Sequence, residues 1–256
     1  MSSKLMYLMR KWPKNAAATA FWLETQGISK ELRYKYQKSG WIESLGVGAF
    51  RKLGEKVGWE GGLYALQQDK LPVHMGGLIA ADHLGFSHYL RFARKRVHLF
   101  APSKTTLPQW FRSHEWEGDV ELHSTNFLPS NLGFITYNKY GFDLRISSSE
   151  RAILECLYLA PAKMDLMECY QILEGMSNLR PQILQSLLES CTSIKVKRLF
   201  LCFAEQANHA WFKYLDQSSI SLGSGSRMLV KGDVYMPRYK ISVPKELVKS
   251  HANSEL

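Results

Sequence analysis

Residues 19 to 52 constrain the fold more than any other stretch, because they read as a helix, a tight turn, a second helix and a short hairpin. Gly27 can adopt the left-handed conformation that ends a helix, and Ser29 is well placed to cap the next one. Gly40 ends the second helix, and Gly48 permits the turn of the hairpin. This order of elements predicts a winged helix-turn-helix.

A helical wheel of residues 30 to 39 gives the second helix two different sides. Leu32 and Tyr36 lie on the side expected to pack against Phe21 and its neighbours in the preceding helix, and Lys35 lies at a boundary. The opposite side carries cations for phosphates and guanine, an amide for adenine, and an aromatic ring for a thymine methyl group or a sugar. The predicted DNA-binding residues are Lys30, Arg33, Tyr34, Gln37 and Lys38 on this helix and Arg51 and Lys52 on the wing.

An ordinary amphipathic helix with a solvated basic face is the alternative explanation of this pattern. The turn, the small-residue helix before it and the hairpin after it agree with one another, and this agreement favours DNA binding. Charge points the same way. The net charge is +10, and residues 1 to 56 hold eleven Lys and Arg residues against four acidic residues, which leaves only +3 for the other 200 residues. Most of the excess therefore lies on the predicted DNA-binding module.

The length of 256 residues and the apolar fraction of 45% favour two folded domains. The predicted fold class is α+β, with an N-terminal winged helix-turn-helix domain followed by a mixed α/β domain that contains several packed helices. We place the first domain at residues 1–93, with its core at 1–56, the second at 94–246, and a frayed tail at 247–256. The predicted helices span 4–11, 59–68, 76–84 and most of 149–215, and the predicted strands span 86–92, 97–100, 120–124 with a continuation at 127–128, 144–146, 220–231 and 239–243.

The four cysteines occupy apolar positions of predicted helices and form no CxxC pair, so buried thiols in a reducing compartment are expected rather than zinc ligands. No apolar run approaches the roughly 18 residues that a membrane span needs. The N-terminus also lacks the apolar core of a signal peptide. A cytoplasmic protein without a membrane partner is therefore expected.

Motifs for catalysis and metal binding are weak in this sequence. Asp119, Glu121 and His123 come closest to a metal-dependent nuclease, but a histidine replaces the expected lysine, and outward charges on a half-buried strand explain them equally well. His74, His83 and His88 lack a completing spacing pattern and are interpreted as core or interface residues. Gly223 and Gly225 fit a hairpin turn better than a phosphate loop. Arg198, Glu205 and His209 form a polar stripe that is expected to reach the surface.

These observations predict a protein that is not an enzyme and that needs no metal or cofactor. Two other functions stay open. One is a metal-dependent nucleic-acid-cleaving enzyme with a winged-helix targeting domain, and the other is a protein-interaction module whose basic helix binds an acidic partner.

Several short sequences follow one another in a characteristic order. They are SGWIESLGVGAF at 39–50, WEGGLYALQ at 59–67, HMGGLIAADHLGFSHYL at 74–90, VHLFAP at 97–102 and LRISSSERAILECL at 144–157, then RPQILQSLLESC, KVKRLFL, NHAWF and YKISVP. In this order they resemble the AbiEi family of antitoxins and transcriptional regulators of type IV toxin–antitoxin, abortive phage infection systems. The resemblance covers about residues 1–246. Ser149 and Ser226 depart from the family pattern, which commonly has proline and lysine there.

The resemblance implies an N-terminal winged helix that binds inverted repeats at the promoter of its own operon and represses it. It also implies a C-terminal domain that neutralises a nucleotidyltransferase-like toxin encoded alongside. Antitoxin and toxin of such phage-defence systems generally form no stable complex. DNA binding is supported by the residues themselves, whereas antitoxin activity rests on the resemblance.

Overall fold

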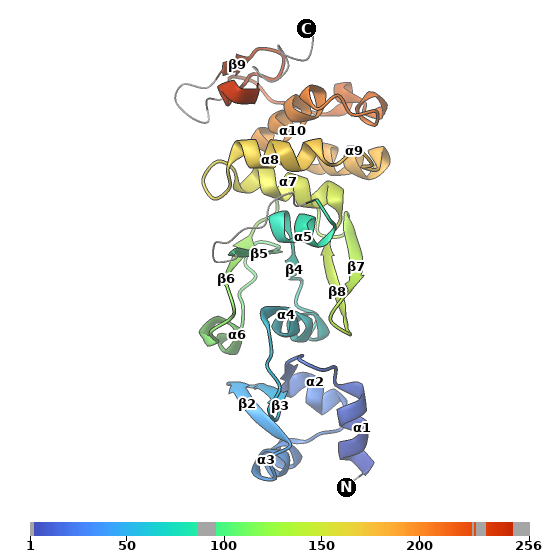
Figure 1. Ribbon diagram of the computed structural model, residues 1–256, viewed down its shortest axis with the longest axis vertical. Coiled ribbons are helices and arrows are strands. Elements are labelled where there is room, and N and C mark those ends of the chain that lie inside the picture. The colour runs from blue at the N-terminus through green and yellow to red at the C-terminus, as the bar shows by residue number, and fades with distance from the viewer. Residues whose placement is uncertain (1–2, 87–95, 227, 229–233, 248–256) are drawn as a thin grey trace. The chain divides into compact units, whose positions relative to one another are not determined.

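The computed structural model describes residues 3–86, 96–226, 228 and 234–247 (Figure 1). Two compact units share these residues, and their segments alternate along the chain. The first unit contains Met1–Met75, Phe92–Ser124 and Thr136–Ile146, and the second contains Gly76–Arg91, Thr125–Ile135 and Ser147–Leu256. The predicted boundary near residue 93, all but the first residue of the predicted strand at 86–92 and most of the predicted tail lie outside the described residues. No helix of the described ranges is both long and apolar enough to cross a membrane.

The first unit begins with the predicted winged helix-turn-helix, which the structure confirms. Its elements are α1 (Ser3–Lys11), β1 (Ala18–Thr19), α2 (Ala20–Thr25), α3 (Lys30–Lys38), β2 (Ile42–Gly46) and β3 (Ala49–Lys52). The three strands form an antiparallel sheet in the order β1-β3-β2, with β3 in the centre. Leu8, Trp12, Leu23, Ile28 and Ile42 are almost completely buried between these helices and strands.

Local chemistry fixes the turn between α2 and α3. The amides of Gly27 and Ile28 donate to the carbonyl oxygens of Glu24 and Leu23, which is a Schellman ending with Gly27 at a φ of 77°. The Ser29 hydroxyl then accepts a hydrogen bond from the amide of Leu32 and caps α3, as predicted. The expected packing of Phe21 against α3 is wrong, because 57% of this residue is exposed.

The rest of the first unit includes most of a five-stranded sheet in the order β6-β5-β4-β8-β7. The elements here are α4 (Trp59–Gln68), β4 (His74–Met75), β5 (Arg96–Ala101), α6 (Gln109–Ser113), β6 (Asp119–Ser124), β7 (Phe134–Asn138) and β8 (Asp143–Ser147). Helix α4 and strands β5, β6 and β8 agree with the sequence predictions, whereas α6 and β7 were not anticipated and residues 127–128 are not a strand.

The second unit is mainly helical. Its elements are α5 (Gly77–His83), α7 (Ser149–Leu159), α8 (Leu166–Glu174), α9 (Pro181–Ser190), α10 (Ile194–Gln206), the 3-10 turns η1 (Phe212–Tyr214) and η2 (Gln217–Ser219), β9 (Val234–Met236) and β10 (Ile241–Val243). Two predicted ends are wrong. A cap at Ser149 is wrong, because Ser149 is the first residue of α7 and Ser148 holds the cap position, and the helix expected to reach residue 215 stops at Gln206, since Asn208 adopts a φ of 50°. Residues 220–226, predicted as part of a strand, are irregular.

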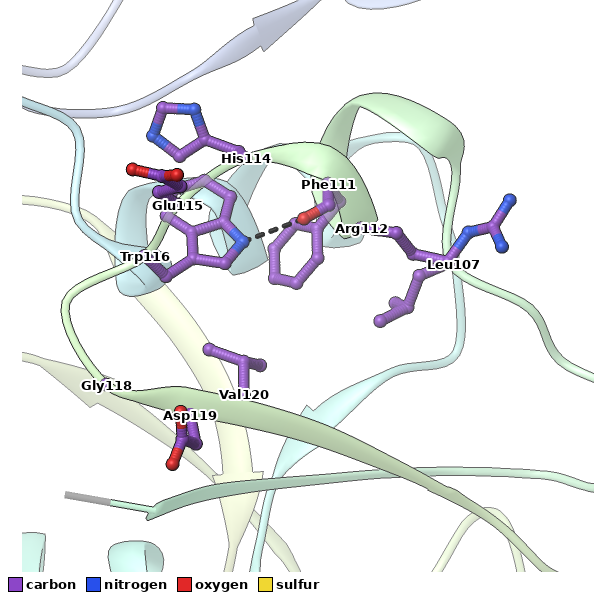
Figure 2. Close-up of a pocket in the computed structure, with 9 residues that line it drawn as sticks. All are labelled: Leu107, Phe111, Arg112, His114, Glu115, Trp116, Gly118, Asp119 and Val120. Carbon is purple, nitrogen blue, oxygen red and sulfur yellow. Dashed lines mark hydrogen bonds between the residues drawn. The ribbon is translucent and has the colours of Figure 1, made fainter. Parts of the chain in front are cut away.

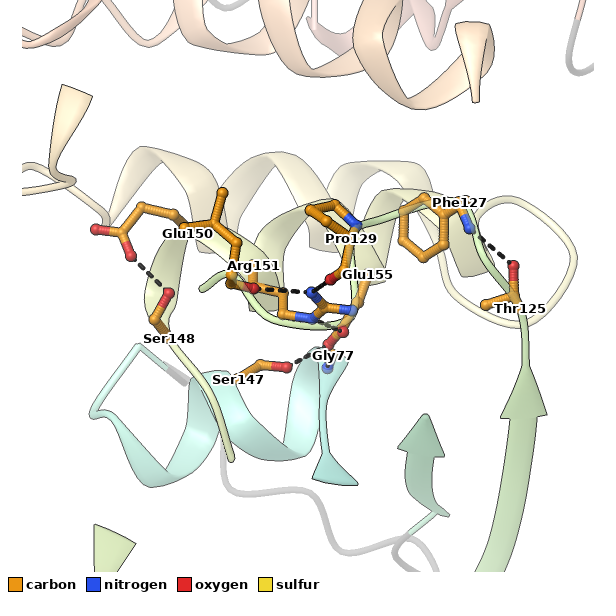
Figure 3. Close-up of polar contacts among 10 residues, drawn as sticks. Gly77, Thr125, Phe127, Pro129, Ser147, Ser148, Glu150, Arg151 and Glu155 are labelled. Carbon is orange, nitrogen blue, oxygen red and sulfur yellow. Dashed lines mark hydrogen bonds and ion pairs between the residues drawn. The ribbon is translucent and has the colours of Figure 1, made fainter. Parts of the chain in front are cut away.

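A buried ion pair joins separate segments of the second unit (Figure 3). The Arg151 Nε atom lies 2.8 Å from Glu155 Oε1, and Arg151 Nη1 donates to the carbonyl oxygens of Pro129 and Leu132. Glu155 Oε2 in turn accepts from the Gly77 amide at the start of α5 and from the Ser147 hydroxyl. These contacts satisfy both buried charges with several hydrogen bonds.

Glu150 makes a second partly buried pair in this unit, with Arg180. Burial by itself raises the pKa of Glu150, but hydrogen bonds from Arg180 and Ser148 outweigh it and lower the pKa to about 2. Because the folded-state pKa lies below the ordinary value of 4.5, the pair stabilises the fold above that value. The stabilisation is lost as the pH falls from about 4.5 towards about 2.

Glu150→Gln should therefore lower the free energy of unfolding at pH 7, by roughly 1–3 kcal/mol. The difference between the wild type and this variant should shrink as the pH falls through that window. Urea unfolding followed by circular dichroism at several pH values measures it, with the exposed Glu117→Gln as the control. A difference that stays constant from pH 7 to pH 2 would contradict the assignment.

Candidate nucleic-acid interface

Helix α3 presents one exposed stripe, which borders an open surface depression. The stripe consists of Lys30, Glu31, Tyr34, Lys35, Lys38 and Ser39. Tyr34 is 60% exposed, and the Lys38 ammonium lies 5.5 Å from the centre of its ring. Three lysines and one aromatic ring therefore share the exposed side of the helix. Lys35, which the helical wheel placed at a boundary, is one of them.

Arg33 is the main correction to the predicted site, because only 9% of its side chain is exposed. Its Nη1 atom lies 2.9 Å from Glu24 Oε1 and also donates to the carbonyl oxygens of Ala20 and Ile28. The expected exposure of Arg33 is therefore wrong. The long apolar stem of arginine can lie along a core while its donors satisfy backbone carbonyl groups. Arg33 thereby ties α3 to α2 and to the turn.

The rotation of α3 follows from this contact. Arg33 and Tyr36 are buried, and Leu32 and Gln37 are half-buried, so the buried side is turned towards Arg33 relative to the predicted wheel. Gln37 lies at the edge of the exposed stripe rather than on it. Of the five helix residues predicted to face DNA, three are exposed: Lys30, Tyr34 and Lys38.

The two wing cations are also engaged in contacts within the unit. Arg51 lies opposite Glu43 on the neighbouring strand, with 3.1 Å between Arg51 Nε and Glu43 Oε1, and about one third of its side chain is exposed. The Lys52 Nζ atom donates to the Trp12 carbonyl oxygen at 2.6 Å, so this lysine does not project from the wing as expected. The tip of the wing is instead apolar, since Val47 is 79% exposed.

The end of β2, directly before the tip of the wing, packs against α6. A Cβ atom on Gly46 would lie 2.8 Å from Trp110 Cβ, so the hairpin passes too close to this helix for any side chain. Beside it, a pocket of about 550 Å³ lies between α6 and β6. Figure 2 shows Val120 pointing towards the rings of Phe111 and Trp116, and the Trp116 Nε1 atom donates to the Phe111 carbonyl oxygen.

The other histidines and acidic residues considered as metal ligands lie on different elements. His83 Nδ1 contacts the Ile79 carbonyl oxygen within α5, whereas His74 is buried in β4, and His88 lies outside the described residues. Asp119, Glu121 and His123 lie on the edge strand β6.

The predicted polar stripe of Arg198, Glu205 and His209 is wrong for Arg198, whereas the other two residues are half-buried. Arg198 is completely buried and donates to the carbonyl oxygens of Leu222 and Lys240, among others. Glu205 pairs with Arg238, and His209 Nε2 lies 2.8 Å from the Leu173 carbonyl oxygen. The four cysteines are buried thiols, as predicted, and burial raises the pKa values of Cys169 and Cys202 to about 12.

Sequence comparison accounts for almost the whole chain. Residues 1–92 match the family described as "Transcriptional regulator, AbiEi antitoxin N-terminal domain". Residues 94–244 match the family described as "Transcriptional regulator, AbiEi antitoxin, Type IV TA system". The winged-helix fold and these matches define a transcriptional regulator. More specifically, the chain belongs to the AbiEi antitoxin family of type IV toxin–antitoxin systems.

Structural comparison finds solved proteins of similar fold, among them the RV2827C protein from Mycobacterium tuberculosis. The two chains share 14% sequence identity and superpose with a TM-score of 0.63 over 97% of this chain and 93% of the other. At this identity the similarity concerns the fold alone. No functionally curated protein matches the sequence.

Arg33→Met should lower the free energy of unfolding by about 1–3 kcal/mol, because it keeps an apolar stem but removes the donors to Ala20, Glu24 and Ile28. Lys35→Met is the matched control on the same helix, and its effect should stay within about 0.5 kcal/mol because Lys35 is exposed. Urea unfolding measures both. Equal effects of the two variants would contradict the structural role of Arg33.

Proposed function

We propose that this protein is a sequence-specific DNA-binding autorepressor that binds inverted repeats at its own promoter, and that it also acts as the antitoxin of its operon. The observation that carries the DNA-binding part is the exposed stripe of α3, with Lys30, Tyr34, Lys35 and Lys38 on one side of a capped helix. A helix of this kind fits the major groove of B-form DNA, where lysines contact phosphates or guanine edges.

Charge and topology support this proposal. The second helix of a helix-turn-helix is the one that enters the groove, and α3 holds this position in the described winged helix. Arg51 at the wing is partly exposed and is suited to a flanking phosphate. Inverted repeats present two equivalent half-sites, so two copies of the winged helix can bind one operator with matching symmetry.

The remaining parts of the proposal concern organisation and partners. We assign DNA binding to a domain at residues 1–93 and toxin neutralisation to a domain at 94–246. The functional partner is a nucleotidyltransferase-like toxin encoded alongside, without a stable complex between the two proteins. Repression and neutralisation both take place in the cytoplasm, and neither requires catalysis by this chain. Membership of an antitoxin and regulator family supports these assignments.

Binding to the upstream region of the operon tests the role of α3. Lys30→Ala, Lys35→Ala and Lys38→Ala should each weaken binding and reduce the slope of log affinity against log salt concentration by about one, because each removes one phosphate contact. Fluorescence anisotropy with labelled operator and random duplexes at several salt concentrations measures the slopes. The control is Lys139→Ala, an exposed lysine of the same unit outside the winged helix.

The outcome can go against the proposal in two ways. Unchanged slopes in all three variants would remove α3 from the DNA interface. Cleavage of the labelled duplex in the presence of Mg²⁺ or Mn²⁺, abolished by Glu121→Ala, would show that the protein is a nuclease instead.

Repression and neutralisation should be separable by mutation. A variant with Lys30, Lys35 and Lys38 all changed to alanine should relieve repression of a promoter reporter, because the α3 cations are gone. The same variant should still restore growth when the neighbouring toxin gene is expressed, because residues 94–246 are unchanged. Loss of both activities at an unchanged protein level would contradict this division of labour.

A further inference from the structure

Strands β5 and β6 bring three potential metal ligands to one face of the sheet. The two strands are parallel, and their register places His98 beside Glu121 and Phe100 beside His123. Alternate residues of a strand point to the same face, so these four side chains share one face. The sequence does not reveal the cluster, because His98 and His123 are 25 residues apart and only the register of the two strands joins them.

The ligand atoms form a small triangle. His98 Nδ1 lies 2.9 Å from His123 Nε2, and Glu121 Oε2 lies 3.9 Å from the first nitrogen and 3.8 Å from the second. In a tetrahedral site with bond lengths of about 2.0–2.1 Å, neighbouring ligand atoms are about 3.3 Å apart. The distance between the two nitrogens is shorter than this value, and the two distances to the Glu121 oxygen are longer. Shifts of about half an ångström would give all three atoms a common metal ion.

We propose that His98, Glu121 and His123 bind one divalent transition-metal ion of the zinc type. Two imidazole nitrogens select such an ion over Mg²⁺, which prefers oxygen ligands. Three protein ligands leave a fourth position for water or for another ligand. The two imidazoles share a hydrogen bond in which one ring donates and the other accepts. To bind the ion, the donating ring moves its proton to its other ring nitrogen, so that both facing nitrogens offer a lone pair.

Burial favours a defined site with an entry path. The side chains of His98 and His123 are only 4% and 9% exposed, whereas the carboxylate of Glu121 is on a side chain that is 44% exposed. The His123 ring centre lies 5.0 Å from the Phe100 ring, which packs in turn against His74. The two imidazoles are therefore held by packing, and the exposed glutamate can close over an incoming ion.

The consequence for the fold concerns an edge strand. Strand β6 is at the end of the five-stranded sheet and pairs with β5 on one side. An ion that joins His98 of β5 to Glu121 and His123 of β6 crosslinks this strand to its neighbour. Because the ion binds the folded state, the thermal stability of the protein should rise with metal concentration.

Metal binding to the full chain tests the proposal. After treatment with a chelator and its removal, the protein is titrated with Zn²⁺ by calorimetry and with Co²⁺ by visible absorption. We expect one equivalent of each ion, the absorption bands of tetrahedral Co²⁺ with nitrogen and oxygen ligands, and a higher melting temperature with Zn²⁺. The exposed Glu121→Gln should reduce the affinity by at least about tenfold, since loss of outer contacts alone costs 10–100-fold.

His123→Gln should abolish the Co²⁺ bands, and His114→Gln is the matched control because His114 belongs to the same unit outside the cluster. Circular dichroism without metal shows which variants fold, and Glu121→Gln decides the question if His123→Gln does not. The proposal is overturned if the wild type binds neither ion, or if Glu121→Gln binds both ions with wild-type affinity.

Discussion

The contact that most of the proposed DNA-binding surface depends on is made by the buried guanidinium of Arg33. Hydrogen bonds from a single nitrogen atom reach α2, the turn and the Glu24 carboxylate, so the rotation of α3 about its own axis is fixed. That rotation decides which side chains are exposed. With Arg33 turned inwards, Lys35 moves onto the exposed side and Gln37 moves to its edge. One buried cation thus selects the set of cations that are available to a polyanion.

Buried arginines that donate to backbone carbonyl oxygens also organise the second unit. Arg151 and Arg198 are both buried, and each is surrounded by carbonyl oxygens of segments that are distant in sequence. A buried guanidinium without such partners would be very costly, so these segments must be in place before the charge can be buried. Arginines therefore connect irregular segments, in which no sheet or helix supplies regular hydrogen bonds. The loop around Gly223 is held in this way by Arg198.

Sequence patterns predicted the parts of the fold that local chemistry determines. The glycine turn at Gly27 and the cap at Ser29 are local signals, and both hold in the structure. Positions that depend on tertiary contacts were missed. The wheel of α3 could not show that Arg33 pairs with Glu24, and helix α6 and strand β7 are too short to show periodicity. The cluster of His98, Glu121 and His123 depends on strand register, which one sequence does not encode locally.

The close approach of Gly46 to Trp110 limits how the wing can change in evolution. The orientation of the wing cannot be changed by altering its own residues alone, because Gly46, next to its tip, lies against the backbone and side chain of Trp110 in α6. A larger residue at position 46 requires α6, which carries Trp110, to move away from the hairpin. Any displacement of α6 would in turn move the hairpin. The two positions should therefore vary as a linked pair, and under the proposed DNA binding a substitution that never touches DNA can alter operator preference.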